Sequence, residues 1–158
     1  MSALTIVERL KLAPDTAEYK AIRNLWKVHS IAEDARDIPG LITTLTENCI
    51  YELVGNNRSW KGHDGATAFY QELLTAFPDA HFDLTEIIIG PQGVFEEAIL
   101  TGTHVEAFAG NAPSGNKISF PVAILFPWDF EKKLFSGEKI YGDWNSIFNR
   151  NLSQPKKP

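Results

Sequence analysis

From Ala80 to the C-terminal region the sequence predicts almost nothing but strands, and this run constrains the fold more than any other feature. Apolar residues alternate with polar ones over long segments, as in strands. Gly90-Pro91-Gln92-Gly93 predicts a turn between two of them. Strands are expected at 80–89, 94–108, 117–128 and 134–148. The run predicts one curved antiparallel sheet.

Before Ala80 the chain predicts mainly helices. Asp15 is the expected cap of a long helix that ends near Asp37. A short helix is expected from Pro39 and another over 64–77, with a strand at 48–54 and a loop at 56–59. Helices followed by strands predict an α+β domain whose sheet packs on a helix layer. The expected organisation is an arm at 1–14, a domain at 15–152 and a disordered tail at 153–158.

The composition limits the partners that the protein can have. The net charge is -5 and the isoelectric point about 5.3, which argues against nucleic acid or an anionic membrane as partner. The single cysteine, Cys49, excludes an internal disulfide and a cysteine-based zinc site. No apolar run has the length of a membrane span or the core of a signal peptide. We expect a cytoplasmic protein.

The long helix carries polar residues on its apolar stripe, which is formed by Ala21, Ile22, Leu25, Val28 and Ala32. His29 falls within this stripe, and Glu33 lies one turn further on. A carboxylate one turn from an imidazole can fix its tautomer and raise its basicity, as a general base requires. We therefore predict that both side chains point into a cavity. The alternative is a structural cluster of His29, Glu33 and Arg36.

The last strand places Glu138, Tyr141 and Asp143 within six positions. Ionisable groups on a strand that lines a pocket have shifted pKa values and can act as acids or bases. The alternation of the strand does not say whether its odd or its even positions point inward. Either Asp143 and Tyr141 point inward, or Glu138 does. Tyr141 and Asp143 can also share the solvent face.

Two further positions are candidates. Gly102 inside the longest predicted strand suggests a bulge that re-aims His104, although His104 can also be structural. Trp60, in a predicted loop, could cap a pocket. The histidines show no close metal-ligand spacing, so no metal site is expected.

The order of elements, together with five short motifs, resembles the SnoaL-like, polyketide-cyclase-like branch of the nuclear-transport-factor-2-like superfamily. The resemblance covers about residues 21–152. The motifs are Ala76-Phe77-Pro78-Asp79, Leu100-Thr101-Gly102-Thr103-His104, Pro113-Ser114-Gly115, residues 126–129 and residues 137–143.

The resemblance implies a cone-shaped fold in which a strongly curved sheet wraps on three N-terminal helices and encloses a pocket. It also implies acid–base chemistry without metal or organic cofactor. The acid that such cyclases carry on the last strand falls on Asp143 or Asn145. The acid position of related epoxide hydrolases falls on Ile140, which cannot do that chemistry.

These observations favour a cofactor-free cyclase, isomerase or hydrolase acting on an apolar, carbonyl-bearing small molecule. The alternative is a non-catalytic binding or dimerisation module. Asp143, His29, Glu33 and His104 are the catalytic candidates. The substrate-binding candidates are Tyr51, Trp60, Glu138, Tyr141 and Trp144. A homodimer through the outer sheet face is expected, because bulky residues occur at both parities of the long strands: Phe95, Ile99, Phe120, Val122, Ile124 and Phe126.

Overall fold

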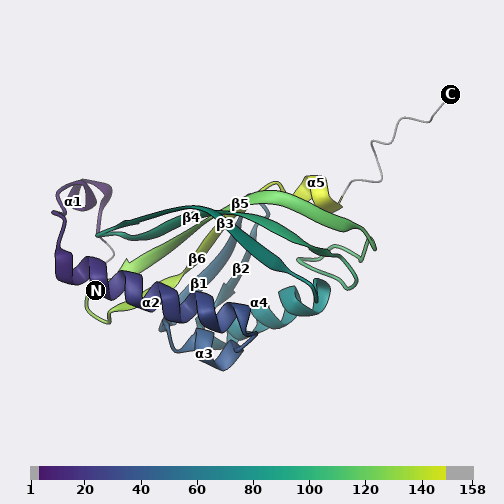
Figure 1. Cartoon of the computed structure of the whole chain (residues 1–158), viewed down its shortest axis with the longest axis horizontal. Helices are drawn as coiled ribbons and strands as arrows, with labels where there is room; N and C mark the ends of the chain where they lie inside the picture. Colours follow the sequence, from purple (N-terminus) through teal and green to yellow (C-terminus); the bar gives the residue numbers. More distant parts are fainter. Residues whose placement is uncertain (1–3, 149–158) are drawn as a thin grey trace.

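A computed structural model, which describes residues 4–148, has a six-stranded sheet that curves over a layer of helices (Figure 1). The helices are α1 (Ile6–Leu10), α2 (Thr16–Asp34), α3 (Ile38–Ile42), α4 (Gly62–Ala76) and α5 (Trp144–Phe148). The strands are β1 (Leu45–Val54), β2 (Arg58–Lys61), β3 (His81–Gly90), β4 (Gly93–Thr103), β5 (Lys117–Asp129) and β6 (Leu134–Gly142). The predicted α+β class is confirmed.

The helix layer forms much as the sequence predicts. The side chain of Asp15 accepts a hydrogen bond from the backbone N–H of Glu18 at 2.7 Å, so Asp15 caps α2 as expected. Pro39 lies in the first turn of α3, where its missing N–H costs nothing. Figure 1 shows α2, α3 and α4 on the same side of the sheet. This side is called the inner face below.

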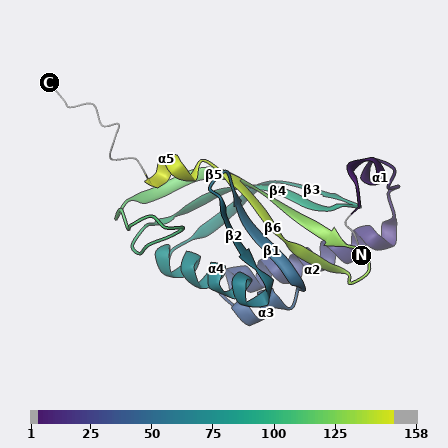
Figure 2. The same ribbon diagram turned by 180° about the vertical axis from the view of Figure 1, so that it is seen from behind.

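The strands follow the order β2-β1-β6-β5-β4-β3. β1 and β6 pair in parallel, so the prediction of a wholly antiparallel sheet is wrong for this pair. β2 pairs with β1 where a loop was expected, because Gly55 and Asn57 have positive φ angles that turn the chain back on itself. Figure 2 shows β2, β1 and β6 side by side from behind.

Two predicted strands are shorter in the structure. β4 ends at Thr103 because the carboxylate of Asp79 accepts hydrogen bonds from the N–H and hydroxyl groups of Thr103, at 2.6 and 2.8 Å. His104 therefore lies just beyond the strand. β6 ends at Gly142, and Trp144, which was expected in the strand, begins α5.

A bulge in β6 decides which residues of that strand face the helices. Gly137 has a φ of 117°, and a Cβ atom there would lie 2.0 Å from the carbonyl oxygen of Ile50. Only glycine allows this close approach of β6 to β1. Before the bulge Phe135 points inward. After the bulge Glu138 and Ile140 point inward, so the inward positions change from odd to even numbers.

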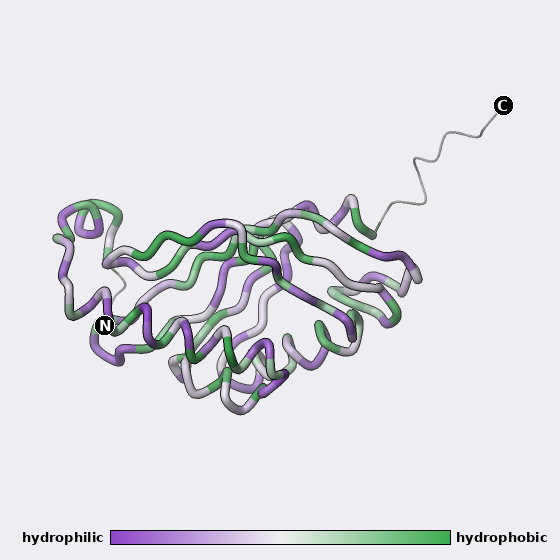
Figure 3. The backbone as a smooth tube through the Cα atoms, viewed as in Figure 1, coloured by the Kyte–Doolittle hydropathy of each residue, from purple (hydrophilic) through white to green (hydrophobic). Residues whose placement is uncertain are grey.

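The core lies between the inner sheet face and the helices. Phe120, Val122, Ile124 and Phe126 of β5 are all buried there, whereas Phe95 is exposed on the outer face. Figure 3 shows apolar and polar residues alternating along the strands. On α2, Val28 is exposed rather than part of the buried stripe, because it lies at the margin of the face that His29 and Ala32 present to the sheet.

The N-terminal arm holds the one-turn helix α1. Thr5 and Glu8 form a capping box, yet no residue of α1 is buried. The tail predicted at 153–158 lies outside the described residues. The division into an arm, a domain and a tail stays a prediction.

Candidate acid–base site

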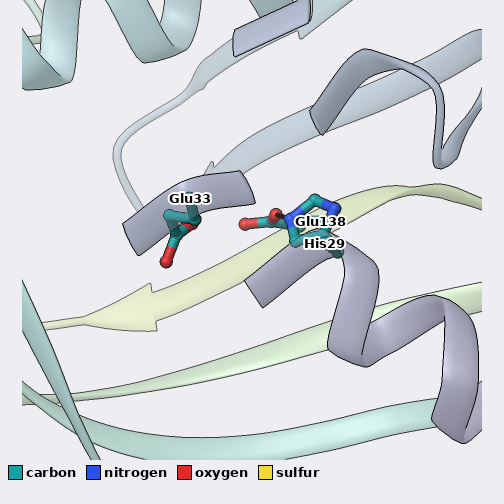
Figure 4. Close-up of side chains that lie close together, drawn as sticks. All are labelled: His29, Glu33 and Glu138. Carbon is teal, nitrogen blue, oxygen red and sulfur yellow. Dashed lines mark hydrogen bonds and ion pairs between the residues drawn. The ribbon is translucent and has the colours of Figure 1, made fainter. Parts of the chain in front are cut away.

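Four side chains from four elements meet between the helices and the sheet. They are His29 of α2, Tyr51 of β1, Tyr70 of α4 and Glu138 of β6, and each is at most 2% exposed. Figure 4 shows the carboxylate of Glu138 beside the imidazole of His29, with Glu33 further along α2. The bulge at Gly137 and the helical spacing of α2 bring these groups together.

One oxygen of Glu138 is the centre of the site. Its Oε1 atom lies 2.9 Å from Nε2 of His29 and accepts hydrogen bonds from the hydroxyl groups of Tyr51 at 2.9 Å and Tyr70 at 2.8 Å. A buried carboxylate needs such donors to remain charged.

The other oxygen, Oε2, accepts no hydrogen bond from the described residues. It is the oxygen that can take up a proton.

Glu33 is a second carboxyl group at this site. Burial raises its pKa well above the ordinary value, and the nearby charges of Glu138 and Glu96 raise it further. Its Oε2 atom lies 3.3 Å from the hydroxyl oxygen of Tyr70. Glu33 is only half-buried, so it connects the buried cluster with the outside.

Glu96 of β4 is the third carboxyl group. Burial first, and then the charge of Glu138, raise the pKa of Glu96 to about 7, although a hydrogen bond from Trp26 acts in the opposite direction. That bond joins the indole Nε1 of Trp26 to Oε2 of Glu96 at 2.8 Å. At neutral pH, Glu96 is therefore partly protonated.

The tyrosines keep their protons. Burial, and after it the charge of Glu138, hold the pKa values of Tyr51 and Tyr70 well above their ordinary value. Both phenols therefore act as hydrogen-bond donors and not as bases.

One group of described residues has the composition of a metal site. Ligand atoms of His29, Glu33 and Glu138 lie within 4.8 Å of one another. However, the atoms facing each other in His29 and Glu138 are already joined at hydrogen-bond distance. The expectation of a site without metal stays a prediction.

His104 and Trp144 belong to a different, aromatic cluster. The imidazole of His104 stacks on Phe77 with ring centroids 5.0 Å apart, and Trp144 packs against Phe108. The N–H of Ser114 donates to Nδ1 of His104 at 3.2 Å, and burial lowers the pKa of His104. No hydrogen bond among the described residues links this cluster to Glu138.

Of the two alternatives left open for the last strand, the structure has Glu138 facing inward, and Asp143 with Tyr141 does not face the interior. Tyr141 points to the outer face, and Asp143 is exposed beyond the end of β6. The carboxylate of Asp143 accepts from the N–H of Ser146 at 3.2 Å and so caps α5. The bulge at Gly137 is the physical reason, because it turns Glu138 inward and the alternate residues outward.

The remaining candidates lie as follows. Trp60 is half-buried on β2, edge-on to Phe69, rather than in a loop. The guanidinium group of Arg36 donates to the carbonyl oxygen of Ala80, so Arg36 does not join His29 and Glu33. Of the nine predicted site residues, the structure brings together His29, Glu33, Tyr51 and Glu138.

Sequence reasoning missed four residues of the site: Trp26, Thr44, Tyr70 and Glu96. Two of them had a signal. Glu96 shares its parity with the apolar Val94 and Ala98, and Tyr70 lies on the apolar face of its helix. Polar groups at core positions need partners, which points to a buried network. For Thr44 and Trp26 we see no signal in the sequence.

Two clefts occur away from this site. One of about 560 Å³ lies beside α3 and is lined by Arg36, Ile38 and Gln71, among others. One of about 570 Å³ lies between the N-terminal arm and the β5–β6 hairpin, where Leu12, Ile50 and Phe130 line it. Neither includes Glu138 or His29.

The chain belongs to the SnoaL-like polyketide cyclase family, whose sequence pattern matches residues 19–145. The resemblance seen in the sequence is thereby confirmed. No curated protein matches the chain in sequence. Among residues 4–148, no helix is both long and apolar enough to cross a membrane.

Solved structures share the fold. A protein from Jannaschia sp. CCS1 named as a SnoaL-like polyketide cyclase is 20% identical, with a TM-score of 0.70 over 92% of this chain and 98% of that chain. An NTF2-like protein from Burkholderia pseudomallei K96243 is 14% identical, with a TM-score of 0.69 over 84% and 98% of the two chains. A protein with a ketosteroid isomerase-like fold from Catenulispora acidiphila, in complex with trimethylamine, is 14% identical, with a TM-score of 0.64 over 78% and 88%. At these identities the likeness shows the fold alone.

Proposed function

We propose that the protein is a cofactor-free acid–base enzyme that acts on an apolar, carbonyl-bearing small molecule, with Glu138 as the base. The observation that carries the proposal is the asymmetry of the Glu138 carboxylate. Three donors hold Oε1, while Oε2 has no partner among the described residues. A general base needs such a fixed carboxylate with one free oxygen.

The reaction that this arrangement supports is removal of a proton from a carbon next to a carbonyl group. The C–H bond breaks, an O–H bond forms at Oε2 of Glu138, and the electron pair moves onto the carbonyl oxygen of the substrate. A carboxyl group that keeps its proton can donate a hydrogen bond to that oxygen. Glu33, whose pKa is raised and whose side chain is half-buried, is suited to this role.

The proposal is tested by hydrogen–deuterium exchange, which needs no knowledge of the final product. A panel of apolar cyclic and aromatic ketones is incubated with the protein in D₂O, and loss of the signal of the protons next to the carbonyl is followed by proton NMR. An enzyme of this kind accelerates exchange for at least one ketone above the rate with buffer and with heat-denatured protein. If no ketone exchanges faster than in these controls, the proposal fails.

The second candidate is a non-catalytic binding module. It is favoured by the burial of the cluster and by the position of both clefts away from Glu138. In that case, titration calorimetry detects binding of a ketone from the panel while exchange stays at the buffer rate.

We also propose that the protein is a cytoplasmic homodimer joined through the outer sheet face. Ile88 and Phe95 are paired across β3 and β4 on this face, and they are 60% and 40% exposed. Exposed apolar groups on a sheet favour association.

A further inference from the structure

We propose that Thr44 is a positioning residue that decides which ring nitrogens of His29 carry protons. Both nitrogens are protonated, so that His29 is an imidazolium beside the carboxylate of Glu138. The inference deepens the proposed function, on which it rests for its catalytic meaning. It is carried by the hydrogen bonds around a single hydroxyl group.

The hydroxyl oxygen of Thr44 makes two short contacts. It lies 2.7 Å from the carbonyl oxygen of Leu41 and 2.7 Å from Nδ1 of His29. Two oxygens at this distance repel each other unless a proton lies between them. The carbonyl group of Leu41 carries no proton, so the single proton of the Thr44 hydroxyl group must lie between the two oxygens. Nδ1 of His29 must then be the donor in the second contact.

The same reasoning applies on the other side of the ring. A neutral imidazole that carries its proton on Nδ1 has a bare lone pair on Nε2. Nε2 nevertheless lies 2.9 Å from Oε1 of Glu138, and an ionised carboxylate cannot donate. The hydroxyl oxygen of Tyr70 also lies 3.2 Å from Nε2, but its one proton is donated to Oε1 of Glu138, which is closer at 2.8 Å. An additional proton therefore lies between Nε2 and Oε1. Because Oε1 already accepts from Tyr51 and Tyr70, we place this proton on Nε2, which makes His29 an imidazolium.

Thr44 is well placed to impose this state. It is fully buried between the end of α3 and the start of β1, and its carbonyl oxygen accepts the N–H of Phe135 at 3.0 Å. The hydroxyl group contacts His29 and the carbonyl oxygen of Leu41, and no hydrogen bond among the described residues joins it to Glu138, so its effect passes through His29. The consequence is that Glu138 remains a carboxylate with a cationic neighbour, ready to accept a proton at Oε2.

The direct test is nitrogen NMR of the histidine rings in the folded, ¹⁵N-labelled protein, with His29 assigned from the signal lost in a His29→Gln variant. Wild-type protein at neutral pH should show both ring nitrogens of His29 protonated. Thr44→Val keeps the shape but removes the acceptor of Nδ1–H. It should show a neutral ring that is protonated on Nε2 only. Thr44→Ser keeps the hydroxyl group and should restore the wild-type pattern.

The inference is overturned if wild-type His29 carries a proton on Nε2 alone, or if Thr44→Val and wild type give the same pattern. If Thr44→Val does not fold, the spectra of the wild type and of Thr44→Ser decide the question instead. In the exchange assay, Thr44→Val should be slower by at least about tenfold and Thr44→Ser close to wild type. If wild-type protein exchanges no ketone but the NMR pattern holds, the proposed function fails while the assignment of protons stands.

Discussion

The hydroxyl group of Tyr70 lies between two carboxyl groups, 2.8 Å from Oε1 of Glu138 and 3.3 Å from Oε2 of Glu33. The hydroxyl group has one proton, which it donates to the closer oxygen, Oε1 of Glu138. The same hydroxyl group faces Oε2 of Glu33, whose pKa is raised by burial and by the charge of Glu138. The half-buried Glu33 is thus joined to the buried Glu138 through one phenol.

Replacing Tyr70 with Phe should destabilise the fold. The change deprives Glu138 of one of three donors inside the protein, and an under-satisfied buried charge is costly. We expect the free energy of unfolding to fall by about 1–3 kcal/mol, measured by urea denaturation. Tyr19→Phe, at an exposed tyrosine of α2, is the control and should stay close to wild type. A Tyr70→Phe protein as stable as this control would show that the phenol does not support Glu138.

Glu96 should make the protein less stable as the pH rises. The pKa of Glu96 is about 7 in the folded protein and 4.5 ordinarily, so between these values the folded state binds more protons than the unfolded state. The free energy of unfolding therefore decreases with rising pH across this window, by about 3 kcal/mol in total from this group.

Urea denaturation between pH 4.5 and 7.5 checks this expectation. Glu96→Gln cannot ionise and keeps an oxygen for the indole N–H of Trp26, so its stability should depend less on pH. Some dependence should remain, because the raised pKa of Glu33 acts in the same direction. The neighbouring exposed residue Glu97, changed to Gln, serves as control. Equal slopes for Glu96→Gln and wild type would contradict the assignment.

Asp143 should matter for local stability and not for proton transfer. Its carboxylate caps α5 and is exposed. Asp143→Ala should therefore cost about 1 kcal/mol, the usual value of a helix cap, measured by thermal melting. Ketone exchange with this variant should stay within a factor of about two of wild type, because exposed groups far from the reacting atoms contribute little. If Asp143→Ala slows ketone exchange as much as a Glu138 variant does, Asp143 is a catalytic residue.

The outer sheet face can be tested by light scattering. If the proposed dimer forms through Ile88 and Phe95, the double variant Ile88→Asp, Phe95→Asp should have half the mass of the wild type at micromolar concentration, because charges disfavour an apolar interface. Val28→Asp, at an exposed apolar residue of α2, should leave the mass unchanged. A wild-type protein that is already monomeric would rule the dimer out.

The sequence predicts the helix side of the site better than the sheet side. His29 and Glu33 follow from helical periodicity, which local geometry alone determines. Whether Glu138 or Asp143 faces the helices depends on the bulge at Gly137, and this bulge arises only when β6 meets β1. Alternation within one strand carries no information about such a contact.

The fold class is predicted from the order of elements, but the parallel pairing of β1 and β6 joins residues about ninety positions apart, which a local pattern does not specify. The role of Thr44 is beyond the reach of the sequence for a similar reason. It depends on how α3, α2 and β6 meet around one imidazole ring.

The rate of ketone exchange with Glu138→Gln decides whether Glu138 is the base. Glutamine keeps the shape of the side chain and an oxygen that can accept from both tyrosines, but it cannot take up a proton. For the ketone that wild-type protein exchanges fastest, we predict that Glu138→Gln is slower by about 100-fold or more, while Glu97→Gln retains the wild-type rate and both variants remain folded by circular dichroism. A folded Glu138→Gln protein that exchanges the ketone at the wild-type rate would show that Glu138 is not the base.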